Sequence, residues 1–186
     1  MSIQFTIPSW YILVPLFLVL IITFVNKTFI RKVFSVEQFV LMLTFTIYSL
    51  AVLHLVFFPI DVNIGPFANQ TPWYSSINFI PILTIDVITF FLNIVMMIPL
   101  GIYLPLLKSS YNSTARIARS VLCVSLCLEV IQLLIRVTLG NGRSTDINDI
   151  IANTLGGVFG FLIYTKLRQV KAIRSLTDRF RISGLF

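Results

Sequence analysis

The sequence predicts an all-α integral membrane protein with five transmembrane helices, an N-terminus outside and a C-terminus in the cytoplasm. Two observations predict this class: 57% of the 186 residues are hydrophobic and only 11% are charged. Soluble domains are about 45–50% apolar and about 25% charged, so this chain lacks the polar residues that a water-facing surface needs. A separate soluble catalytic domain is excluded, because five spans of about 20 residues use most of the chain.

Five apolar stretches are predicted to cross the membrane, and together they form one transmembrane domain over residues 1–165. The first lacks a basic leader and a small-residue cleavage site, so we expect a retained anchor and not a signal peptide. The fifth is polar at its start and is the weakest by hydropathy. The predicted spans are residues 8–25, 38–58, 87–107, 120–139 and 147–165.

The distribution of basic residues predicts the orientation of these spans. Twelve of the 14 Lys and Arg residues fall in three segments, whereas residues 2–26 and 61–86 contain none. Basic loops remain in the cytoplasm, so the pattern requires an odd number of spans and supports the weak fifth one. Residues 166–186 are expected to form a cytoplasmic tail beside the membrane. Their basic side chains suit the anionic inner leaflet, and their apolar residues recur near a helical period, which is typical of a helix that lies on the membrane surface. The clustered basic residues are Lys27, Arg31, Lys32, Lys108, Arg116, Arg119, Lys166, Arg168, Lys171, Arg174, Arg179 and Arg181.

Ionisable residues inside a span are costly and are therefore candidates for function. Glu129, Gln132 and Arg136 share one face of the fourth span, because they lie three and four residues apart. Asp146, Asp149 and Asn153 form a similar stripe at the start of the fifth span. With the predicted orientation, both stripes lie in the outer half of the membrane. Arg143, just before the fifth span, and Asn93 in the third belong to the same layer.

Two interpretations of this polar layer remain open. It could form a ligand-binding or catalytic cluster, or it could hold helices together, pairing Glu129 with Arg136 or Arg143 and Asn153 with Asn93. Gly156 and Gly160 continue the stripe of the fifth span with the spacing of a close helix contact, so we expect a structural role for them. Two cysteines and one histidine predict no zinc cluster or disulfide framework, and we expect no metal or cofactor.

Four strings of the sequence resemble the VanZ-like family of small bacterial membrane proteins. The family pattern is N-x-x-x-F-x-P-x-G, then E-x-x-Q, then R-x-x-D-x-x-D-x-x-x-N-x-x-G-x-x-x-G, and it covers about residues 50–165. Met97 replaces the usual phenylalanine of the first motif, a change that affects packing more than chemistry. The strings are NFIPI (78–82), FLNIVMMIPLGIYLP (91–105), SLCLEVIQLLI (125–135) and RSTDINDIIANTLGGVFG (143–160).

The resemblance implies a protein of the bacterial plasma membrane that is linked to teicoplanin resistance or to the cell envelope. The family is named for a protein of glycopeptide-resistance clusters that gives low-level teicoplanin resistance. It supplies no mechanism. The residues that match its polar positions are Asn93, Glu129, Gln132, Arg143, Asp146, Asp149 and Asn153.

Three functions fit the residues. The first is a non-enzymatic envelope factor whose outer polar pocket binds a lipid head group or the lipoglycopeptide, with Arg136 and Arg143 holding an anionic group. Asn93, Gln132 and Asn153 would orient that ligand. The second is a membrane enzyme that acts on a lipid-linked cell-wall precursor, with the candidate catalytic residues Glu129, Asp146 and Asp149 binding a divalent cation or acting as a general base.

The third function is a small transporter or flippase, which helices broken at mid-membrane would favour. The Pro99-Leu100-Gly101 turn and Pro105 supply one such break. Because the sequence has five spans and no internal repeat, this function requires an oligomer, and the sequence does not set the oligomeric state. The expected partners are membrane lipids in every case, with no nucleic acid.

Overall fold

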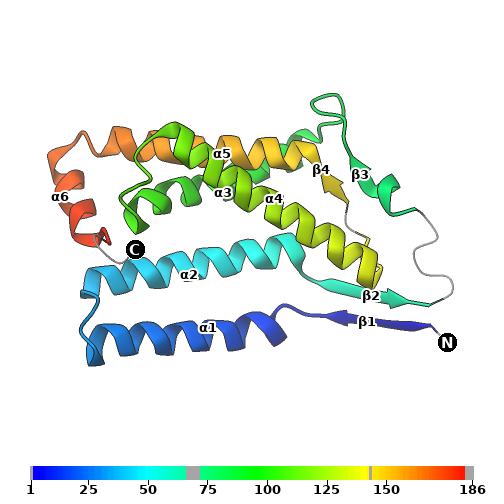
Figure 1. The fold of residues 1–186 in the computed structure, drawn as a ribbon, viewed down its shortest axis with the longest axis horizontal. Helices are drawn as coiled ribbons and strands as arrows, with labels where there is room; N and C mark the ends of the chain where they lie inside the picture. Colours follow the sequence, from blue (N-terminus) through cyan, green and yellow to red (C-terminus); the bar gives the residue numbers. More distant parts are fainter. Residues whose placement is uncertain (1, 66–71, 143, 183–186) are drawn as a thin grey trace.

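The computed structural model describes residues 2–65, 72–142 and 144–182, and within them five helices are long and apolar enough to cross a membrane (Figure 1). This confirms the predicted number of spans, including the weak fifth. The third span has the predicted bounds, and the others differ by a few residues at their ends. The five helices are α1 (Trp10–Val25), α2 (Val36–Phe57), α3 (Val87–Leu107), α4 (Thr114–Leu139) and α5 (Ile147–Leu167).

The helix ends differ from the predicted spans where polar residues continue a helix beyond its apolar part. Helix α4 begins at Thr114, six residues before the predicted start, because Arg116 and Arg119 extend it outside the apolar stretch. Helix α1 continues through a π-helical turn, Asn26–Ile30. Helix α2 begins with a capping box in which the side chains of Ser35 and Gln38 each accept from the other's backbone N–H.

The class of the fold needs one correction, because the chain is not entirely helical. Strand β1 (Ile3–Ile7) pairs antiparallel with β2 (Ile60–Ile64), and β3 (Ile77–Asn78) pairs parallel with β4 (Thr145–Asp146). These strands lie where the chain leaves the helices, and their pairing satisfies backbone groups that no helix serves. Strands of two to five residues are too short for an alternation of hydrophobic and polar residues to reveal them in the sequence.

The helices form two layers (Figure 1). Helices α1 and α2 run side by side in one layer, and α3, α4 and α5 form the other. Helix α3 lies closest to α5, because Gly156 and Gly160 allow the α3 backbone to approach. A Cβ atom at either position would collide with the carbonyl oxygen of Ile94 or Ile98. Helix α3 continues without interruption through Pro99 and Pro105, so it is not the broken helix that would favour a transporter.

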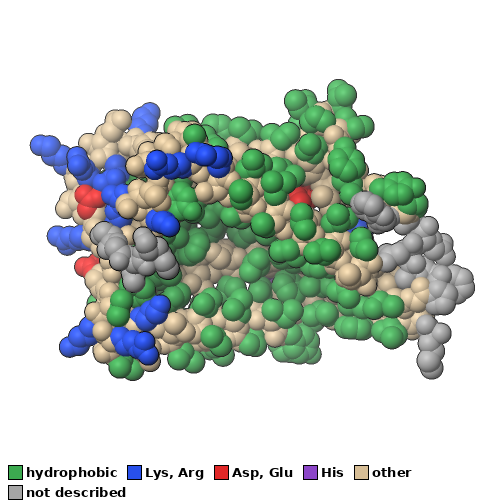
Figure 2. Space-filling view, viewed as in Figure 1, with side chains coloured by type: hydrophobic (Ala, Val, Ile, Leu, Met, Phe, Trp, Pro, Cys, Tyr) green, Lys and Arg blue, Asp and Glu red, His purple; other side chains and the backbone are tan. Residues whose placement is uncertain are grey.

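The two ends of the bundle differ in charge. The strands β1–β4 mark one end, which we call the strand end. Short helix α6 (Lys171–Phe180) and the turns between α1 and α2 and between α3 and α4 mark the other, which we call the basic end. Figure 2 shows that Lys and Arg side chains gather at the basic end. The three basic segments therefore share one end, as five alternating spans require.

The tail is folded against the basic end. After α5 ends at Leu167, a turn leads to α6, so the predicted helical period of the tail is divided between two helices. Ile182 donates its backbone N–H to the carbonyl of Leu106 (3.0 Å), and Gln38 donates to the carbonyl of Arg181 (3.2 Å). These bonds attach the tail to the end of α3 and the start of α2.

Candidate functional site

A cavity of about 580 Å³ lies between α2, α3, α4 and α5, toward the strand end. We call it the polar cavity, because Asn93, Glu129, Gln132, Asp149 and Asn153 all line it. Figure 2 shows the molecule hollowed between its two helical layers. The structure therefore brings together five of the site candidates, from three helices, around one space.

The rest of the cavity wall is apolar. Its outer residues include Leu55 of α2 and Leu92 and Val95 of α3, with exposed fractions of 62%, 58% and 45%. These side chains lie on the surface that the bilayer would cover. The cavity is thus polar inside and apolar where it opens toward lipid, a combination that suits the head and tail of an amphiphile.

Glu129 is placed by the chain segment that starts α5. Its side chain accepts a hydrogen bond from the backbone N–H of Asp146 (3.2 Å), and it is only 5% exposed. The Asp146 carboxylate faces the other way and caps α5, since it accepts from the N–H of Asn148 at 2.8 Å. Asp146 therefore positions Glu129 and α5 without lining the cavity.

Asp149 is held by α3. The amide of Asn93 donates to a carboxylate oxygen of Asp149 at 2.6 Å, across the closely packed α3–α5 interface. Both side chains also line the polar cavity. This bond explains why two helices that are otherwise apolar at their contact each carry a polar residue at the same level.

The helix-contact interpretation paired Asn153 with Asn93, and the structure gives each of them another partner. Asn153 donates instead to the hydroxyl of Ser125 on α4, at 2.9 Å, and Asn93 is bonded to Asp149. The amide of Gln132 donates to the backbone carbonyl of Val56 at the end of α2, at 3.0 Å. Each amide thus joins a different pair of helices, which shared helix faces alone do not specify.

The arginines are placed less centrally than expected. Arg136 donates to the backbone carbonyl of Gly142, at 3.3 Å, in the connection between α4 and α5, and it does not line the polar cavity. Arg143 lies outside the described residues. The described part of the cavity wall therefore gives no support to the expectation that Arg136 holds an anionic ligand there.

Three polar residues that the sequence did not predict as site residues hold the cavity residues or the start of α5 in place. Asn78 donates to the second oxygen of Asp146 at 3.0 Å, and buried Asn148 accepts from the backbone N–H of Ile82 at 2.8 Å. Ser125 is fully buried and holds Asn153. The first motif string contains Asn78, so that residue was recognisable. Ser125 was not, because a lone serine within an apolar helix has no distinctive spacing.

The three-carboxylate cation site finds no support in the geometry of the described residues. Within residues 2–65, 72–142 and 144–182, no three His, Cys, Asp or Glu side chains come together in an arrangement that could hold a metal ion. Asp146 turns toward Asn78 and Asn148, away from the cavity that Glu129 and Asp149 line. The proposed three-carboxylate cation site is therefore not formed here.

Comparison with known protein families matches residues 45–169 to VanZ/LLP1. The chain belongs to this family. The match covers more than half of the chain and agrees with the resemblance of the motif strings. No curated protein and no solved structure matches the chain.

The VanZ/LLP1 match separates the molecule into two parts. It begins within α2 and ends just after α5, so it contains every described residue of the polar cavity. It leaves out α1 and α6. The family relationship therefore concerns the helices that build the polar cavity, and not the first helix or the basic tail.

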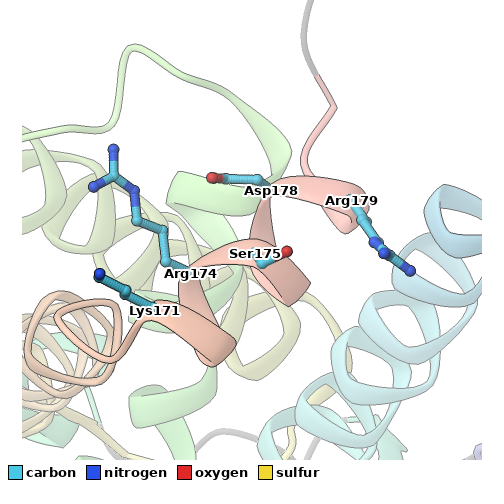
Figure 3. Close-up of a pocket in the computed structure, with 5 residues that line it drawn as sticks. All are labelled: Lys171, Arg174, Ser175, Asp178 and Arg179. Atoms are coloured by element: carbon cyan, nitrogen blue, oxygen red, sulfur yellow. The ribbon is translucent and has the colours of Figure 1, made fainter.

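Helix α6 forms a second concave surface, at the basic end (Figure 3). Figure 3 shows Lys171 and Arg174 on one side of the helix and Arg179 directed toward α2. Asp178 on α6 forms a 2.6 Å ion pair with Arg168 at the end of α5. This surface suits anionic lipid head groups at the membrane surface. It lies at the opposite end of the bundle from the polar cavity.

Proposed function

We propose that this VanZ-family protein acts in the bacterial plasma membrane as a non-enzymatic envelope factor. Its polar cavity binds the head group of a lipid or lipoglycopeptide, and this binding links it to teicoplanin resistance or envelope maintenance. The observation that carries the proposal is the cavity itself, with polar groups from three helices inside and apolar residues at the lipid-facing mouth. A membrane amphiphile can enter such a site sideways from the bilayer.

The proposal also requires the polar cavity to lie in the outer half of the membrane. The gathering of basic residues at the opposite end supports this orientation, because basic segments remain in the cytoplasm. Single cysteines at exposed Ser75 and Ser175, introduced after Cys123 and Cys127 are changed to serine, test it. An impermeant thiol reagent added to intact cells should label Ser75→Cys and not Ser175→Cys; the reverse pattern would invert the topology.

The second test concerns function. Glu129→Gln and Asp149→Asn keep size and hydrogen-bonding capacity while removing a charge from the cavity wall. Each should abolish the contribution to teicoplanin resistance while the melting temperature of the purified protein stays near that of the wild type. Asp61→Asn, the same kind of change at an exposed carboxylate of β2, is the matched control and should retain resistance.

The outcomes separate a binding site from helix contacts. Lost resistance together with lost thermal stability would mean that the polar residues only hold the helices together, since removing one partner of a buried polar contact destabilises a protein. Retained resistance in both variants would contradict the proposal.

An enzyme remains the second candidate, because two carboxylates, Glu129 and Asp149, line one cavity. One of them could act as general base toward a lipid-linked precursor. Incubation of the wild type and Glu129→Gln with a lipid-linked cell-wall precursor, followed by mass spectrometry, distinguishes the two functions. A product formed only by the wild type would favour the enzyme, whereas an unchanged precursor supports the binding protein.

A further inference from the structure

We infer that the polar cavity holds the primary ammonium group of an amphiphile, and that it does not take up a phosphate or another anionic group in place of the ammonium. This inference rests on the proposed function, and it names the chemical class of the ligand. It reverses the expectation, drawn from the arginines of the sequence, that the site would hold an anion.

The first argument is how the amide donors of the cavity are used. Asn93 donates to Asp149, Gln132 donates to the carbonyl of Val56, and Asn153 donates to Ser125. All three amides thus direct an N–H group toward the protein. The Val56 carbonyl can only accept, so it fixes which end of the Gln132 amide faces α2.

The second argument is that acceptors are left without partners. The side-chain oxygens of Gln132 and Asn153 are buried and have no hydrogen-bond partner in the structure. Asn153 as a whole is 3% exposed, and both residues line the polar cavity. Buried polar groups in proteins nearly always have a partner, so two orphaned acceptors on residues of one cavity wall indicate a ligand that donates.

The third argument is charge. Glu129 and Asp149 add carboxylates to the same cavity wall, and each has one oxygen engaged by a hydrogen bond within the protein. None of the described residues that line the cavity is Lys or Arg. A phosphate would bring further acceptor oxygens to a wall already rich in carboxyl and amide oxygens, whereas an ammonium group offers a positive charge and three donors.

The shape of the cavity fits the rest of such a ligand. A volume of about 580 Å³ is ample for a small head group and the first methylenes of its chain. The exposed side chains of Leu55 and Leu92 at the mouth would contact that chain where it enters the bilayer. The ligand is therefore an amine that carries an apolar tail, either an amino lipid of the membrane or an amphiphilic drug with a free amine.

Calorimetric titration of the purified full chain in maltoside micelles tests the inference with three probes of equal tail length. These are dodecylammonium, dodecanol and dodecyl phosphate. We expect saturable binding of dodecylammonium with a dissociation constant at least tenfold below that of dodecanol, and no saturable binding of dodecyl phosphate. The preference for dodecylammonium should fall at least tenfold in the double variant Glu129→Gln/Asp149→Asn and persist in Asp61→Asn. The melting temperatures of both variants are measured to check that they are folded.

Equal or tighter binding of dodecyl phosphate would overturn the inference and leave the proposed head-group site standing. A preference for dodecylammonium that is unchanged in a folded double variant would also overturn the inference. The preference would then not depend on Glu129 and Asp149 and would reflect partitioning of the probe into the micelle. Failure of all three probes to saturate would contradict both the inference and the proposed function. The wild-type ratio of affinities is informative even if the double variant fails to fold.

A second arm identifies the source of the amine. The dodecylammonium titration is repeated in nanodiscs of phosphatidylethanolamine and of phosphatidylcholine. Weaker apparent binding in phosphatidylethanolamine supports an ammonium site filled by a membrane lipid, because that lipid competes. Equal binding in both supports an ammonium site that takes an amine from outside the membrane.

Discussion

Helix α1 and helix α5 are both long and apolar enough to cross a membrane, but they are used differently. Only 11% of the most apolar stretch of the first span is buried, against 39% for α5. Phe24 is the one residue of α1 that is buried, and α1 packs mainly against α2. Helix α5 buries asparagines, glycines and aromatic residues against both α3 and α4.

The difference shows that the span with the lowest hydropathy is the one that is most buried against other helices. In a bilayer, apolar side chains gain nothing by leaving lipid for protein, so close packing and hydrogen bonds drive helix association. The least apolar span is therefore the central one. It carries both the glycine contact and the polar cavity, and the VanZ/LLP1 match includes it while excluding α1.

The largest effect should come from filling the α3–α5 contact. Gly160→Leu places a side chain where a single Cβ would already collide with the backbone of Ile98 and Gly101. Overpacking against backbone should cost about 3 kcal/mol and lower the folded yield in detergent. The matched control is Gly142→Leu, since a Cβ there meets nothing within 4 Å. A Gly160→Leu protein that melts like the wild type would contradict the claim that close packing of α3 against α5 stabilises the fold.

A smaller difference is expected between two truncations. Phe161 of α5 is 5% exposed and packs beside Tyr164. Phe→Ala costs about 3–5 kcal/mol in a soluble core. Because burial from lipid carries no transfer gain, we expect Phe161→Ala to cost only about 2 kcal/mol. Leu18→Ala on α1, at a position 52% exposed, should change the free energy of unfolding by less than about 0.5 kcal/mol. Thermal melting of both variants in one detergent compares them. Equal losses would show that α1 packs as extensively as α5.

The smallest effect is expected at the end of α5, where Arg168 meets Asp178. The pair is partly exposed, and exposed ion pairs contribute about 0–1 kcal/mol. Asp178→Asn should therefore lower the melting temperature slightly, and less at high salt because the charges are screened. A loss as large as that of Phe161→Ala would mean that the tail, and not the α3–α5 contact, stabilises α5.

The polar site was predictable as a set of residues but not as a set of bonds. Spacings of three and four residues placed Asp149 with Asn153 and Glu129 with Gln132 on common helix faces, and the structure places all four around one cavity. The contact between Asn153 and Asn93 that the helix-contact interpretation offered is replaced by others, because a helix face does not specify which neighbouring helix it meets. Asn153 meets Ser125 on α4 instead.

The sequence by itself determined the five spans, because lipid demands about 20 apolar residues in each helix and makes ionisable residues inside a span conspicuous. Its motif strings indicated the family. Tertiary structure alone decided which polar atoms are satisfied. The Gln132 amide turns its donor to Val56 and leaves its oxygen without a partner, since the end of α2 presents a carbonyl there. Such pairings depend on the relative placement of helices, and that placement follows from packing at glycines such as Gly156 and Gly160.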